Sequence, residues 1–109
     1  MKLIEIESHF WELYQDQQQL YLSVSVDNSA VTYNWDLHLT AQQIEAYQRQ
    51  GRDSIVELAK QVVAAVFRGD FSFMQQHEAT AAEKAAMQAQ LATLSDVPGL
   101  AAALAAVRE

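Results

Sequence analysis

Apolar and polar residues alternate strictly along the chain from Leu20 to Leu39. A period of two over this length indicates strands that bury one face only. A slip by one residue would move every apolar side chain to the other face, so the pattern restricts the pairing of the two strands. With Asn28-Ser29 as a two-residue turn, the apolar face pairs Val26 with Val31, Val24 with Tyr33, Leu22 with Trp35 and Leu20 with Leu37.

A first strand is expected over Leu3–Tyr14. A short turn within residues 16–19 places Trp11 and Leu13 on the apolar face of the hairpin. Ile4 and Ile6 have the opposite parity, so either a β-bulge near Ser8-His9 changes their face, or they face a second layer or a partner. We favour the bulge. Residues 1–40 are thus predicted to form a three-stranded antiparallel meander with one apolar face.

Two helices are predicted over residues 41–69. Thr40 and Gln43 have the spacing of a capping box, which predicts a helix from about Ala41 to Gln50, with Gly51 at its end. The next helix is expected to start at Asp53 or Ser54, with Glu57 completing a second capping box, and to end at Gly69. Its apolar residues follow amphipathic spacing, so it should lie across the apolar face of the sheet; they are Ile55, Leu58, Ala59, Val62, Val63 and Val66.

The last third of the chain is rich in alanine. Residues 70–76, with Phe71 and Phe73, fit either a short edge strand or a loop that closes the core. A capping box from Thr80 to Glu83 predicts a helix to about Leu94, and residues 95–99 should break it. Met87, Leu91 and Leu94 share one side of this helix, and a last helix carries Leu100, Leu104 and Val107.

The expected fold class is α+β in a single domain, residues 1–109. A three-stranded antiparallel meander is packed on one face by helices, and residues 79–108 form an Ala-rich C-terminal helical hairpin. That pair of helices fits either a hairpin on the domain or a dimer contact, and the sequence leaves both open. Half of the residues are hydrophobic, which is enough for a core without disulfides.

The sequence contains no motif for catalysis or metal binding. It has no Cys, and its three His residues lack partners at metal-ligand spacing; they are His9, His38 and His77. It also lacks a nucleophile elbow, a glycine-rich phosphate loop and carboxylates predicted to face each other across a cleft. We therefore expect no enzymatic activity, no cofactor and no metal.

No apolar run is long enough to span a bilayer. The first ten residues carry acids where a signal peptide has an apolar run. These features predict a cytoplasmic protein without membrane contact.

Negative charge is concentrated in the predicted sheet. The formal charge is −7 overall, with −5 in residues 1–40, +1 in residues 41–69 and −3 in residues 70–109. This distribution disfavours direct nucleic-acid binding and favours a basic protein partner. Tyr21 lies on the polar face, opposite Asp36 in the predicted pairing, and Tyr is enriched at interface centres. The candidate partner-binding residues are Glu12, Asp16, Tyr21, Asp27, Asp36 and His38, which fit an ordinary solvated sheet face equally well.

The middle third of the chain resembles a known group of proteins. Residues 36–62, DLHLTAQQIEAYQRQGRDSIVELAKQV, follow an acidic hairpin; the features that carry the likeness are Leu37-His38-Leu39, Glu45, Tyr47, Gly51-Arg52 and Leu58-Ala59. This segment resembles small acidic immunity proteins of bacterial contact-dependent growth inhibition and related polymorphic toxin systems. The resemblance implies a cytosolic, non-enzymatic protein that binds a cognate toxin domain, often a nuclease, and blocks its active site or an adjacent surface.

Two other functions fit the same charge pattern. The first is an acidic secretion chaperone or assembly adaptor that forms a homodimer through its C-terminal helices. The second is a mimic of nucleic acid, although the acids are scattered rather than arrayed like phosphates. We expect an inhibitor that binds a basic toxin domain.

Overall fold

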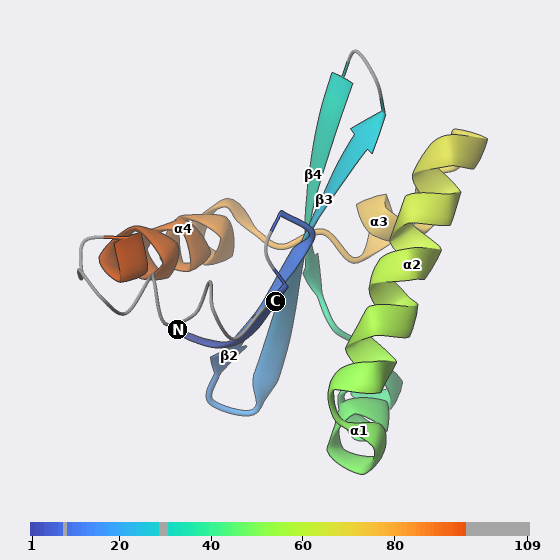
Figure 1. Cartoon of the computed structure of the whole chain (residues 1–109). Helices are drawn as coiled ribbons and strands as arrows, with labels where there is room; N and C mark the ends of the chain where they lie inside the picture. Colours follow the sequence, from blue (N-terminus) through green and yellow to red (C-terminus); the bar gives the residue numbers. More distant parts are fainter. Residues whose placement is uncertain (8, 29–30, 96–109) are drawn as a thin grey trace.

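The computed structural model describes residues 1–7, 9–28 and 31–95 of the chain. The described part is α+β, with an antiparallel sheet in the strand order β1-β2-β3-β4 and helices on both sides of it (Figure 1). The strands are β1 (Lys2–Glu7), β2 (Trp11–Asp16), β3 (Gln19–Asn28) and β4 (Val31–His38). The helices are α1 (Ala41–Gln50), α2 (Arg52–Arg68), α3 (Ser72–Gln76) and α4 (Ala81–Ser95).

The described sheet has four strands, so the prediction of a three-stranded meander is wrong. The chain reverses where the bulge at Ser8-His9 was expected: His9 has a φ of 64°, and the Phe10 amide donates to the Glu7 carbonyl at 3.0 Å. A turn changes the face of the following residues as effectively as a bulge does, which is why parity could not distinguish the two. The irregular pairing lies instead between Leu3 and Glu5, and Ile4 packs against the main core.

The β3–β4 register differs from the prediction by two residues. Val24 pairs with Trp35 and Val26 with Tyr33, and Asn28 is still paired within the ladder. Because side chains alternate with a period of two, this shift leaves every residue on its predicted face. The face assignment is therefore confirmed and the pairing is corrected. Of the predicted turn, Ser29 lies outside the described residues.

Helices α1 and α2 cover the apolar face of the sheet (Figure 1). The predicted capping box of α1 is present: the Gln43 amide donates to Thr40 Oγ1 at 3.2 Å, and the Thr40 amide donates to Gln43 Oε1 at 2.8 Å. The second predicted capping box is absent, because α2 begins directly after Gly51 and the Ser54 hydroxyl donates to the Gly51 carbonyl at 2.9 Å. Gly51 has a φ of 67°, which a residue with a side chain rarely adopts.

One core joins this face to the helices. It combines alternate residues of the strands with the apolar stripe of α2, as the sequence predicts. Phe71 and Phe73 close its end around the short helix α3, which replaces the predicted edge strand or loop; the Phe71 ring lies 5.7 Å from the Trp35 ring. The buried residues are Trp11, Leu13, Leu20, Leu22, Val24, Val26, Leu37, Leu39, Ile55, Leu58, Ala59, Val62, Ala65, Val66 and Met74.

Helix α4 covers part of the opposite face of the sheet (Figure 1). Its Met87 packs with Ala79 on Tyr14 and Tyr21, and Leu3 borders this second cluster. The sheet is therefore packed on both faces, whereas the sequence analysis predicts helices on one face only. The predicted last helix, with Leu100, Leu104 and Val107, lies outside the described residues.

The capping box that starts α4 is confirmed. The Glu83 amide donates to Thr80 Oγ1 at 3.2 Å, and the Thr80 amide donates to Glu83 Oε1 at 2.8 Å. The segment before it runs along the edge of β4: the His38 amide donates to the His77 carbonyl at 2.7 Å, and the Ala79 amide donates to the Asp36 carbonyl at 2.8 Å. These bonds place the start of α4 beside the end of β4.

Arg52 links edge strand β1 to the corner between α1 and α2. Its guanidinium donates to Glu7 at 2.5 Å, lies 3.5 Å from Glu5 and stands 4.7 Å from the centre of the Trp11 ring. The Tyr47 hydroxyl donates to Glu5. Glu5 and Glu7 are therefore paired on the side of the sheet that α1 and α2 cover.

None of the helices in the described part of the chain has the length and apolar character needed to cross a membrane.

The two-sided core leads to a stability prediction. Leu22 is fully buried on β3, whereas the Phe67 side chain on α2 is 59% exposed. We expect Leu22→Ala to lower the free energy of unfolding by about 2–5 kcal/mol, because it leaves a cavity under α2. Phe67→Ala, the matched truncation, should change it by less than about 0.5 kcal/mol. Urea denaturation measures both, and equal losses would contradict the assignment of the core.

Candidate functional site

Glu12, Ser23 and Asp36 form a row across three neighbouring strands. Glu12 on β2 is paired with Ser23 on β3, and Ser23 is paired with Asp36 on β4. Paired residues on adjacent antiparallel strands point to the same side of the sheet. In the next row, the Ser25 hydroxyl donates to Asn34 Oδ1 at 2.8 Å. These two rows thus present two carboxylates and three short polar side chains on the α4 side of the sheet.

A groove of about 270 Å³ lies between these rows and α4. Its floor is polar, and Met87 and Leu91 of α4 supply an apolar wall. Asp36 forms no ion pair with another described residue. The full lining is Glu12, Tyr14, Ser23, Ser25, Asn34 and Asp36 from the sheet, with Met87, Gln88 and Leu91 from the helix.

Tyr14 is the most buried polar side chain of this groove, with 1% of its surface exposed. No hydrogen bond from its hydroxyl to another described residue is present. Burial, followed by the negative charges of Glu12 and Asp36, raises the pKa of Tyr14. Tyr14 is therefore a neutral phenol at physiological pH, available as a hydrogen-bond donor or acceptor.

Tyr21 and His38 lie beneath the start of α4. Tyr21 is only 4% exposed, and its hydroxyl donates to Glu83 at 2.7 Å. Its ring stacks on the His38 ring at 5.0 Å, and His38 Nε2 lies 2.6 Å from Gln19 Oε1. Tyr21 lies on the face that its parity predicts, but α4 covers this end of the face, so its side chain is buried. In the observed register it is paired with His38 and not with Asp36.

The other two candidate residues lie apart from the groove. Asp16 is exposed beside the β2–β3 turn, with a carboxylate oxygen 3.8 Å from the amino group of Met1. Asp27 is exposed on the far end of β3, paired with Thr32, where the β3–β4 hairpin extends beyond α4 (Figure 1). Of the six predicted residues, Glu12 and Asp36 line the groove, Tyr21 and His38 contact each other outside it, and Asp16 and Asp27 lie apart.

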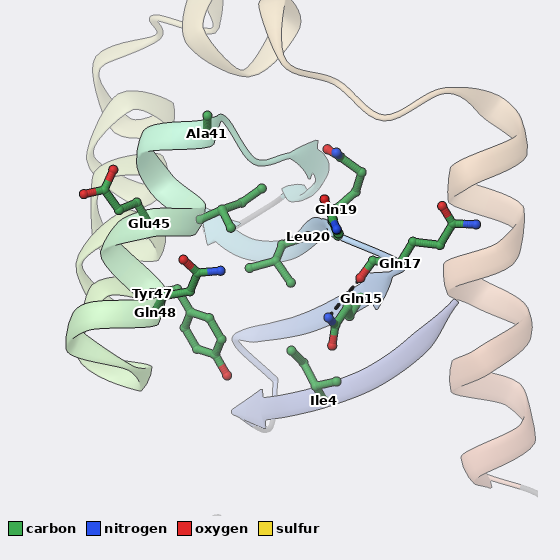
Figure 2. Close-up of a pocket in the computed structure, with 11 residues that line it drawn as sticks. Ile4, Gln15, Gln17, Gln19, Leu20, Ala41, Glu45, Tyr47 and Gln48 are labelled. Atoms are coloured by element: carbon green, nitrogen blue, oxygen red, sulfur yellow. Dashed lines mark hydrogen bonds between the residues drawn. The ribbon is translucent and has the colours of Figure 1, made fainter.

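A larger groove, of about 610 Å³, lies between α1 and the β2–β3 turn (Figure 2). Ile4 and Leu20 reach it from the sheet, and Tyr47 from α1. Its remaining lining is mostly amide side chains, and Glu45 is 3.8 Å from Arg49. Neutral amides can hydrogen-bond to a ligand but supply no acid, base or nucleophile. Its glutamines are Gln15, Gln17, Gln18, Gln19 and Gln48.

In the described part of the chain, no group of three or more His, Asp or Glu side chains is arranged to hold a metal ion. Comparison with models of protein families, with curated proteins and with solved structures found no match. The function of the chain is therefore inferred from the geometry of its own side chains.

Sequence reasoning missed Tyr14 and the wall formed by α4. Tyr14 shares its parity with Glu12, and Tyr21 stands opposite it in the neighbouring strand. Two aromatic residues side by side on a nominally polar face are a signal that another element covers them. Met87 and Leu91, one turn apart on the Ala-rich helix, are the matching signal.

The bond between Tyr21 and Glu83 predicts a pH-dependent contribution to stability. The Thr80 amide, and then the Tyr21 hydroxyl, lower the pKa of Glu83 below its ordinary value of 4.5. A carboxyl group with a lowered folded-state pKa stabilises the protein above its unfolded value, and this contribution is lost as the pH falls through the folded value. We expect Tyr21→Phe to cost about 1–2 kcal/mol of unfolding free energy at neutral pH, and less in acid.

Urea denaturation over a pH series measures this difference. Tyr33→Phe is the matched control, because no hydrogen bond from the Tyr33 hydroxyl to a described residue is present. Glu83→Gln, which retains an acceptor without a titratable group, should flatten the acid dependence. A Tyr21→Phe difference that stays constant down to strongly acidic pH would contradict the role of the Glu83 carboxylate.

Proposed function

We propose that this chain is a non-enzymatic inhibitor that acts in the cytoplasm by binding one basic protein directly. The resemblance of residues 36–62 to immunity proteins supports a cognate toxin domain, of the nuclease class, as that protein. The observation that carries the proposal is the position of Glu12 and Asp36 in one row across the sheet, both lining the groove beside α4. Both side chains line this groove and are partly exposed.

The distribution of ion pairs between the two sides of the sheet supports binding of a basic protein on the α4 side. On the helical side, Glu5 and Glu7 are held by Arg52. Asp27 and Asp36 form no ion pair with other described residues. The only Lys or Arg on the described strands is Lys2, while the remaining Lys and Arg residues of the described part lie on helices; these are Arg49, Arg52, Lys60, Arg68 and Lys84.

An acidic surface suits inhibition of a nuclease for a physical reason. Enzymes that act on nucleic acid collect Lys and Arg where they contact phosphates. A surface with carboxylates at that place pairs with the same side chains and excludes the substrate, and long-range attraction speeds the encounter. The chain then needs no catalytic group and no cofactor of its own.

The proposal predicts a salt-sensitive one-to-one complex with the product of the neighbouring upstream gene, and loss of that product's toxicity. Asp27→Lys with Asp36→Lys should weaken binding at least about tenfold and reduce its salt dependence, because two attractive contacts become repulsive. Glu45→Lys with Glu57→Lys is the matched control: it makes the same charge change on α1 and α2, where these side chains are 68% and 69% exposed.

Calorimetric titration over a salt series measures both pairs of variants. Equal weakening by the two pairs would exclude the sheet as the binding surface. Absence of a complex, together with a homodimer in solution, would reject the inhibitor and support the adaptor that dimerises through its C-terminal helices.

A further inference from the structure

The groove beside α4 places anionic groups on both sides of one small space. Glu12 and Asp36 flank Ser23, one strand away on either side. With adjacent strands about 4.8 Å apart, their backbones are separated by roughly 10 Å. Both side chains line the same groove, so a cation between them meets a carboxylate from each side.

Tyr14 supplies a second and independent feature of the groove. Its side chain is 99% buried, lines the groove and forms no hydrogen bond to another described residue. A ligand that enters the groove can hydrogen-bond to this phenol, which can act as donor or acceptor.

The apolar wall formed by α4 indicates which kind of cationic group fits the groove. Met87 and Leu91 are apolar and stand beside the carboxylates. Long cationic side chains pack their aliphatic stems on such surfaces and extend their charged ends to polar groups. The groove, at about 270 Å³, is below the range for small-molecule pockets, roughly 300–1,000 Å³. It therefore suits one side chain better than a larger ligand.

The acceptors of the groove favour arginine over lysine. Arginine has a planar guanidinium with five N–H donors, which can reach Glu12, Asp36 and the Tyr14 oxygen together. Lysine carries a compact, strongly hydrated charge with three donors and satisfies such a spread of acceptors less well. We propose that the groove between the sheet and α4 binds one arginine side chain of the partner protein. This inference rests on the proposed function.

The test uses the full chain and N-acetyl-arginine amide as the probe. We expect a saturable change in the NMR signals of Glu12, Tyr14, Ser23, Asp36 and Met87, localised to the groove. The lysine analogue should bind at least about fivefold more weakly, because it lacks the planar fork. The citrulline analogue keeps the shape without the charge and should leave the signals unchanged.

Matched variants locate the site. Glu12→Gln with Asp36→Asn should abolish the arginine response. Asp16→Asn with Asp27→Asn removes the same charge outside the groove and should preserve the response. Tyr14→Phe should weaken arginine binding at least about twofold without lowering the stability of the fold, since the lost hydroxyl has no partner in the described part of the chain.

Equal responses to arginine, lysine and citrulline would overturn the site, and so would equal losses from the two double variants. The arginine response and inhibition of a toxin are separate measurements. Specific arginine binding without an inhibited partner would retain this site and reject the inhibitor. A partner complex without an arginine response would retain the inhibitor and reject this site.

Discussion

The fold depends on the burial of β3 on both of its faces. On one face, Leu22 and Val24 are fully buried under α2. On the other, Tyr21 is almost as deeply buried under the start of α4, and its hydroxyl bonds to Glu83. A central strand with one aliphatic face and one mixed face can hold two unlike layers, because a tyrosine presents an apolar ring and a polar tip to the same neighbour.

The groove lies at the boundary between the apolar and the acidic part of the sheet face that packs on α4. Leu3, Tyr14 and Tyr21 pack with α4, whereas the neighbouring row carries Glu12 and Asp36. Burying two carboxylates beneath an alanine-rich helix would require cations or hydrogen-bond donors to compensate their lost hydration. The helix therefore covers the tyrosine row, and the acidic row remains at its side with Met87 and Leu91 as its wall.

Local signals in the sequence predicted much of this fold. Alternation assigned the apolar face of the sheet, and the capping boxes at Thr40 and Thr80 placed the starts of α1 and α4. Features that depend on contacts between distant elements were not predicted from the sequence. Parity could not separate a bulge from a turn near His9, and α4 on the second face followed from no single local motif, although Tyr14 and Tyr21 pointed to a cover there.

The candidate site shows the same division between local and non-local information. Parity placed Glu12 and Asp36 on one face, but the predicted hairpin register set Asp36 opposite Tyr21. The observed shift of two residues keeps every side chain on its face and moves Asp36 opposite Ser23, into the row of Glu12. Hydrophobic burial is almost indifferent between these registers, because both bury the same set of residues. The face of each side chain is thus set by the pattern, whereas the neighbours that make the groove are set by the register.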